Sequence, residues 1–219
     1  MESIDLARVL VAQGVEAVVC TPHYSPSFPT RHKLARERFD ELVRDLHELD
    51  VPLEAELAAE VHFTLALSVA AEELTARSIS GFLLVELETG AAARLPVVVL
   101  ERLRPAGLVP IFAHPERCPD VRADPAGLDE ARAGGALVQV LASSLGGRRG
   151  ETIAQAGWSM LDSGRADLLA TDAHGAGGTV RRLRQILDIA TQRYGPAAID
   201  NLVRHTPAKV LGSVAPQAS

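Results

Sequence analysis

Six apolar runs of strand length recur along the chain, and segments with helical patterning separate them. This alternation predicts a β-α-β-α order, in which the strands are parallel and buried on both faces. The chain is therefore predicted to adopt an α/β fold. The runs span 15–20, 53–59, 82–85, 109–113, 136–141 and 168–170.

Histidines and carboxylates follow five of these runs, and a Ser-Ser pair follows the run 136–141. The carboxyl ends of parallel strands meet at one edge, where α/β folds keep their active sites. A single such residue at a strand end is more often a cap or a solvated side chain, but six of them together indicate a shared metal centre. The candidate ligands are His23, Glu60, Glu86, His114, Asp172 and His174.

Two short motifs sharpen this prediction. In an extended segment the side chains of residues i and i+2 point the same way, so Asp172 and His174 can coordinate one metal ion. Arg117 follows His114 by three residues, and a guanidinium suits bidentate binding of phosphate. Histidine and carboxylate ligands without thiolate favour zinc, manganese or iron and suit a hydrolytic site with several metal ions.

Composition limits the remaining choices. The chain has 219 residues, 47% apolar content and a net charge of −6, which predicts one domain over residues 1–219 with a sizeable core. A pI of about 5.6 argues against a nucleic-acid partner. No apolar stretch is long enough to predict a membrane span, and two cysteines without a disulfide pattern favour a reducing cytoplasm.

Helical periodicity predicts the elements between the runs, and the first predicted element is a helix rather than a strand. This helix spans 4–13 and is closed by Gly14. Thr30 is the expected cap of the second helix, and Pro207 is expected to break the last one. The other helices are predicted at 30–48, 64–76, 95–104, 125–134, 150–164, 179–194 and 197–211.

Five motifs in this order resemble those of a known family, the metal-dependent bacterial protein tyrosine phosphatases of the polymerase and histidinol phosphatase (PHP) superfamily. Members of this family are associated with capsule and exopolysaccharide biosynthesis. The resemblance covers nearly the whole chain and is specific as a set. The motifs are Thr21-Pro22-His23-Tyr24, Ala59-Glu60-Val61, Leu84-Val85-Glu86, Ala113-His114-Pro115-Glu116-Arg117 and Thr171-Asp172-Ala173-His174.

The resemblance implies a distorted TIM-like (β/α)7 barrel with a cluster of divalent metals, typically Mn²⁺ with Fe or Zn as alternatives, at its carboxyl-terminal rim. It implies that all six candidate ligands bind metal, that Arg117 holds the substrate phosphate, and that His114 and Asp172 act with it in catalysis. A metal-activated hydroxide would attack the phosphorus of phosphotyrosine. The implied partner is a phosphotyrosine protein, such as the tail of a bacterial tyrosine kinase.

The chain departs from the family pattern at three places. The family begins with a strand that carries a His-x-His pair, so we expect the first strand of the barrel to be missing and the run 15–20 to form a sheet edge. Leu141 stands where the family has Asn. No arginine follows His174 within six residues, and the nearest ones, Arg181 and Arg182, are more typical of solvated positions.

Two other functions stay open on the sequence. One is a small-molecule phosphoesterase of the histidinol-phosphate type, and the other is a catalytically impaired protein that binds phosphotyrosine. A thiol-based phosphatase is excluded, because Pro26 and Asp124 stand where such enzymes need an arginine six residues after Cys20 or Cys118. His62 lies two residues after Glu60 and is a further residue to test.

Overall fold

The computed structural model describes residues 2–88 and 93–212. All of its paired strands run parallel, six of them in one sheet of order β2-β4-β5-β6-β7-β8 and two in a smaller sheet, β1-β3. The predicted α/β class is confirmed. The strands are β1 (Ala17–Cys20), β2 (His23–Tyr24), β3 (Glu54–Leu57), β4 (Glu60–His62), β5 (Phe82–Glu86), β6 (Val109–Ala113), β7 (Leu137–Leu141) and β8 (Leu168–Ala170).

Each of the first two apolar runs forms one strand, β1 or β3, and a second short strand, β2 or β4, follows it. Cys20 is paired with Leu57 at the end of the β1-β3 ladder, and His23 with Glu60 at the start of β2-β4. Both ladders keep the same register, so β2 and β4 continue β1 and β3 after a short interruption. Pro22 lies in this interruption and cannot donate a backbone hydrogen bond, although its carbonyl accepts one from Glu60 N at 3.2 Å.

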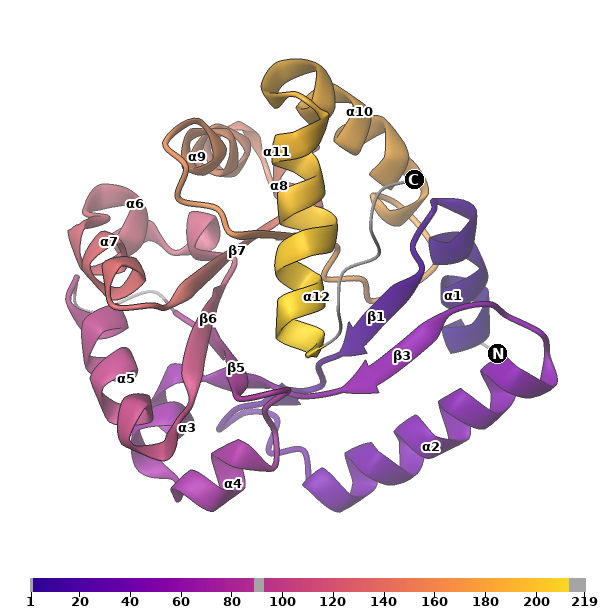
Figure 1. The fold of residues 1–219 in the computed structure, drawn as a ribbon, viewed down its shortest axis with the longest axis horizontal. Coiled ribbons are helices and arrows are strands. Elements are labelled where there is room, and N and C mark those ends of the chain that lie inside the picture. Colours follow the sequence, from indigo (N-terminus) through magenta and orange to yellow (C-terminus); the bar gives the residue numbers. More distant parts are fainter. Residues whose placement is uncertain (1, 89–92, 213–219) are drawn as a thin grey trace.

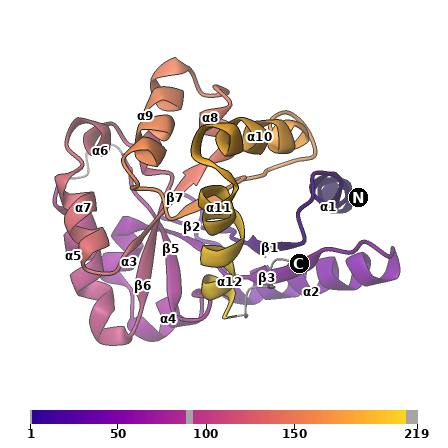
Figure 2. The ribbon, with the colours of Figure 1, turned by 45° about the horizontal axis from the view of Figure 1, so that its top comes forward.

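Helices cover the outside of the curved sheet. Figure 1 shows α3, α5, α7 and α9 ranged around the strands, and Figure 2 shows α1 and α2 at the β1-β3 end of the molecule. The longer helices are α1 (Glu2–Ala12), α2 (His32–Glu48), α5 (Leu95–Leu103), α7 (Ala126–Ala133), α9 (Glu151–Asp162) and α10 (Leu183–Tyr194). The shorter ones are α3 (Phe63–Ser68), α4 (Ala71–Thr75), α6 (Pro119–Ala123), α8 (Ala142–Leu145), α11 (Pro196–Asp200) and α12 (Thr206–Leu211).

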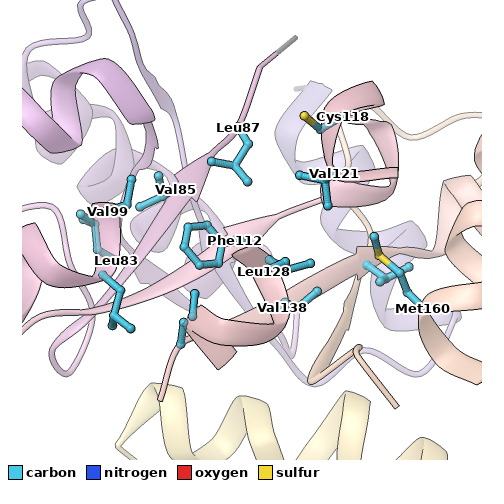
Figure 3. Close-up of a cluster of buried hydrophobic side chains, with 14 of the residues drawn as sticks. Leu83, Val85, Leu87, Val99, Phe112, Cys118, Val121, Leu128, Val138 and Met160 are labelled. Carbon is cyan, nitrogen blue, oxygen red and sulfur yellow. The ribbon is translucent and has the colours of Figure 1, made fainter. Parts of the chain in front are cut away.

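The main core fills the space between the sheet and these outer helices. Phe112 of β6 is fully buried there, with Val85 of β5 and Val138 of β7 on either side of it, and Leu128 of α7 covers them (Figure 3). Burying each of these side chains contributes about 1.5–3 kcal/mol. This packing holds β5, β6 and β7 in place, and the candidate site lies at their carboxyl ends.

The opposite face of the sheet packs against α12. Ile111 of β6 and Leu168 of β8 point away from the outer helices and form a small cluster with Val210 of α12. In Figure 1, α11 and α12 cross in front of the strands. The helix α12 therefore covers part of the inner surface of the sheet.

The sheet is open between β8 and β1. Within the described residues, β1 pairs only with β3 and β8 pairs only with β7. The run 15–20 is thus a sheet edge, as predicted. The β1 residues Ala17, Val18, Val19 and Cys20 are all half-buried.

Three helix predictions need correction. The segment 64–76 is split into α3 and α4 at Val69 and Ala70, which are extended. Thr30 does not cap α2, because Arg31 occupies the cap position. Pro207 does not end the helical backbone, but a π-helical turn at Asn201–His205 interrupts the α-helix directly before α12, in which Pro207 is the second residue. The short helices α6 and α8 were not predicted.

Across the described ranges, no helix combines the length and the apolar character that crossing a bilayer requires.

Candidate metal centre

Four of the candidate ligands occupy neighbouring strands at one edge of the sheet. His23 lies in β2, Glu60 begins β4, Glu86 ends β5 and His114 directly follows β6. These strands are adjacent in the order β2-β4-β5-β6, and His23 is the ladder partner of Glu60. Parallel pairing therefore brings together side chains that are far apart in the sequence.

Glu60 is the centre of this group. Its Oε2 lies 2.7 Å from His23 Nδ1 and its Oε1 lies 3.0 Å from His114 Nε2. The same His114 nitrogen is 3.8 Å from Glu86 Oε1. His23, Glu60 and Glu86 each offer a ligand atom, and these three atoms all lie within 4.8 Å of one another.

This donor set fits a divalent metal ion. Two ligands that each lie about 2.1 Å from one ion are at most about 4.2 Å apart, so small side-chain rotations would bring the three donors into range. Imidazole nitrogen and carboxylate oxygen without thiolate suit zinc, manganese or iron. His114, which contacts both carboxylates, can join the same set.

The pKa values of the two glutamates are shifted in opposite directions. Burial alone would raise the pKa of Glu60, but the hydrogen bond with His114 and the positive charges of His114, His23 and Arg117 outweigh it and hold that pKa below its ordinary value. Burial, followed by the charge of Glu60, raises the pKa of Glu86. Two carboxyl groups this close in a buried site favour a cation between them.

His114 and Asp172 both have backbone conformations that are unusual for residues other than glycine. Their φ angles are +36° and +49°, in the left-handed region. Such conformations cost about 1–3 kcal/mol each and persist where the surrounding structure fixes them, often at functional sites. The chain turns sharply at these two residues as it leaves β6 and β8.

Asp172 and His174 lie at the same edge but outside the tight group. The carboxylate of Asp172 pairs with Arg117, with 3.1 Å between Oδ2 and Nη1. His174 is exposed, its Nδ1 is 3.0 Å from the carbonyl oxygen of Asp172, and its ring centroid is 5.8 Å from that of His23. The prediction that Asp172 and His174 share a metal ion with the other four ligands stays a prediction.

Glu116 is a buried carboxyl group to which the sequence had given no role. Its Oε1 accepts hydrogen bonds from Ser144 Oγ at 2.7 Å and from Leu141 N at 3.1 Å. Its Oε2 is buried without a partner among the described residues, and burial raises the pKa of the group. Through these hydrogen bonds, Glu116 connects the turn that contains His114 and Arg117 with the end of β7 and with α8. Its place inside the His-Pro-Glu-Arg motif was the only available sign.

His62 is buried beside the group and has structural partners of its own. Its Nδ1 accepts from Thr64 N at 3.3 Å at the start of α3, and its Nε2 lies 3.1 Å from Glu88 Oε2. It is therefore a helix cap rather than a member of the tight donor set.

Cys20 and Cys118 are free thiols, and burial raises the pKa of Cys20, which makes it a poor nucleophile.

Comparison with known families gives this geometry a context. The family model described as capsular polysaccharide synthesis, CpsB/CapC, matches residues 1–212. The chain belongs to the CpsB/CapC family. The matched region includes every candidate ligand together with Arg117 and Glu116.

Named relatives share this family likeness. Tyrosine-protein phosphatase YwqE of Bacillus subtilis is 24% identical over 197 residues, which cover 89% of this chain and 78% of the relative. A putative tyrosine-protein phosphatase, CapC of Staphylococcus aureus, is 27% identical over 190 residues, covering 85% and 74%.

The fold is also that of solved structures. A chain from the crystal structures of YwqE of Bacillus subtilis and CpsB of Streptococcus pneumoniae, described as unique metal-dependent tyrosine phosphatases, superimposes with a TM-score of 0.82. The two chains are 22% identical, and the match covers 97% of this chain and 87% of that one. The likeness confirms the α/β architecture predicted from the strand runs.

Proposed function

We propose that this protein is a metal-dependent protein tyrosine phosphatase that acts in capsular polysaccharide synthesis. The observation that carries the proposal is the convergence of His23, Glu60, Glu86 and His114 at the carboxyl edge of the sheet. The names of the CpsB/CapC relatives and of the superimposed crystal structures support it.

His23, Glu60, Glu86 and His114 would hold the metal, and Asp172 and His174 are the proposed ligands on its open side. We propose manganese, with iron and zinc as alternatives for the same donors. Divalent ions bound in such sites polarise a phosphoryl oxygen and lower the pKa of water. The two glutamates can give this set of ligand side chains a net negative charge, which attracts the metal ions.

Arg117 is the proposed anchor of the substrate phosphate. Its guanidinium has five N–H donors, and its recorded ion pair with Asp172 uses only Nη1. The remaining donors can bind two phosphoryl oxygens in the planar geometry that suits them. Asp172 therefore has a proposed second task, which is to orient Arg117 while it lies beside the metal ligands.

The proposed substrate is phosphotyrosine in a protein, such as the tail of a bacterial tyrosine kinase, and the proposed location is the cytoplasm. The ordinary pKa of a tyrosine phenol is about 10, so the leaving group can depart without full protonation. His114 holds Glu60 in place and is, with Asp172, the proposed catalytic partner of Arg117.

One observation favours a second candidate, a protein that binds phosphotyrosine but hydrolyses it poorly. Asp172 pairs with Arg117 rather than joining the His23, Glu60 and Glu86 group, and the sheet edge beside β1 is open within the described chain. If Asp172 and His174 do not bind metal, the centre keeps only part of the predicted ligand set. Phosphate binding through Arg117 would survive this loss, while hydrolysis would not.

Metal analysis combined with three substrates separates the candidates. The purified chain is loaded with Mn²⁺ and assayed on a phosphotyrosine peptide, a phosphoserine peptide of the same sequence, and histidinol phosphate. The proposal predicts bound metal and preferred hydrolysis of the phosphotyrosine peptide. Preference for histidinol phosphate indicates a small-molecule phosphoesterase, and tight binding of the peptide without hydrolysis indicates the impaired form.

A further inference from the structure

A cavity separate from the proposed metal ligands lies between segments that follow the carboxyl ends of β7 and β8. It has a volume of about 360 Å³ and opens between two loops, one after α8 and one after β8. It is lined by Gly147 and Arg148 from one segment and by Gly178, Thr179 and Arg182 from the other, together with Ile186 of α10. None of these residues belongs to the proposed metal or catalytic set.

The cavity is lined by positive charge that the protein does not neutralise. Arg148 and Arg182 are both exposed, and neither forms an ion pair with a described carboxylate. Arg182 donates from Nε to Gln185 Oε1 at 3.2 Å, which leaves both terminal nitrogens free to bind a ligand. The protein as a whole has a net charge of −6, so this is a local reversal of charge. Such a concave positive site favours anions.

Glycine makes this arrangement possible. A Cβ atom added at Gly178, where φ is +57°, would lie 2.0 Å from Arg148 Nη1. The guanidinium of Arg148 is thus pressed against the backbone of the facing loop, a position that only glycine permits. The two loops hold Arg148 and Arg182 across one opening, and no side chain from residues 146, 147 or 178 fills it.

The cavity is close to the metal centre along the chain. Gly178 follows His174 by four residues, which span at most about 14 Å when fully extended. In the other segment, Gly147 follows Ser144 by three residues, and Ser144 binds the Glu116 side chain beside Arg117. An extended peptide advances about 3.4 Å per residue, so about four residues of a bound peptide would cover the span that the chain allows between His174 and Gly178.

We propose that this cavity is an anion-binding subsite that recognises an acidic group of the peptide substrate, a few residues from the phosphotyrosine. The acidic group is a carboxylate or a second phosphate, both of which a guanidinium pair can bind. The position relative to phosphotyrosine rests on the proposed function, but the affinity of the cavity for an anion does not. The substrates would then be acidic or multiply phosphorylated segments.

The test compares three phosphotyrosine peptides of equal length on the full chain loaded with Mn²⁺. One has a neutral flank, one has glutamate three residues from the phosphotyrosine, and one has phosphoserine there. The double variant Arg148→Ala/Arg182→Ala is compared with the wild type and with Lys33→Ala/Arg44→Ala. The control removes two exposed positive charges from α2.

The wild type should hydrolyse the acidic peptides with kcat/KM about ten-fold above the neutral one, mainly through a lower KM. The double variant should lose this preference and keep its activity on the neutral peptide, whereas the control variant should keep both. The more favoured acidic peptide identifies carboxylate or phosphate as the preferred group. Equal rates for all three peptides, or a preference that survives in the double variant, would overturn the subsite.

Failure of the proposed function gives a different result. If no peptide is hydrolysed, the subsite is tested by fluorescence anisotropy of the same labelled peptides. Tighter binding of the acidic peptides to the wild type than to Arg148→Ala/Arg182→Ala then supports the subsite, and equal binding overturns it.

Discussion

Arg117 and Asp172 are 55 residues apart in the sequence, and Nη1 of the arginine lies 3.1 Å from Oδ2 of the aspartate. The pair joins the turn after β6 to the segment after β8 across the carboxyl edge of β7. It links the proposed phosphate anchor to a proposed metal ligand. Asp172 is therefore expected to orient Arg117 for the substrate phosphate through this contact.

Substitution of Arg117 should reduce catalysis without removing metal. We expect Arg117→Ala to lower kcat for a phosphotyrosine peptide by about ten- to a thousand-fold, the scale of one lost oxyanion donor. Arg117→Lys should restore little of this, because an ammonium cannot form the planar pair of bonds. Metal content should be unchanged, since a guanidinium is not a ligand. Unaltered hydrolysis in Arg117→Ala would remove this residue from the site.

Substitution of Glu60 should act on the metal itself. Glu60→Gln keeps the size of the side chain but removes the charge that faces His23 and His114. We expect Mn²⁺ affinity, measured by calorimetry, to fall by at least about ten-fold, the scale found even for residues that only support metal ligands. Glu88→Gln is the matched control, because Glu88 is exposed and contacts His62 rather than the donor group. Equal Mn²⁺ affinity in wild type and Glu60→Gln would contradict the proposed centre.

Glu116 should be required for the position of the turn that carries His114 and Arg117. Glu116→Ala leaves Ser144 Oγ and Leu141 N without their acceptor, which costs about 1–3 kcal/mol of unfolding free energy. Glu116→Gln keeps an acceptor oxygen and should lose less. Urea unfolding measures both variants. If Glu116→Ala is as stable as the wild type, the buried carboxyl group does not hold the turn.

The ion pair between Asp129 of α7 and Arg165, which precedes β8, should make a small contribution to stability that depends on pH. Its Arg165 Nε–Asp129 Oδ1 distance is 2.7 Å, and the hydrogen bond from Arg165 lowers the pKa of Asp129. A lowered carboxyl pKa stabilises the fold above the unfolded value, about 3.9, and this stabilisation is lost as pH falls through the folded pKa.

We expect Asp129→Asn to cost about 0.5–1 kcal/mol at pH 7, because the pair is partly exposed, and to cost less at pH 3, below the unfolded pKa of an aspartate. Thermal unfolding at both pH values measures this difference. An equal loss at the two pH values would show that Asp129 acts through packing rather than through its charge.

The sequence by itself determined six of the eight strands of the described chain and the ligand residues that follow them, but not the short strands β2 and β4. Apolar periodicity and strand length are local properties, so the run 109–113 and His114 after it were recognisable without a fold. Parallel pairing then placed His23, Glu60, Glu86 and His114 at one edge, as predicted. The roles of these residues in catalysis, and the assignment of residues 1–219 to one domain, stay predictions.

The tertiary structure decided everything that depends on contacts between distant segments. No local pattern shows that Arg117 pairs with Asp172, that Ser144 binds Glu116, or that Val210 covers Ile111. The same holds for the cavity between Arg148 and Arg182. Such contacts arise because packed helices and loops bring side chains together in three dimensions, while sequence periodicity records only the face on which each side chain lies.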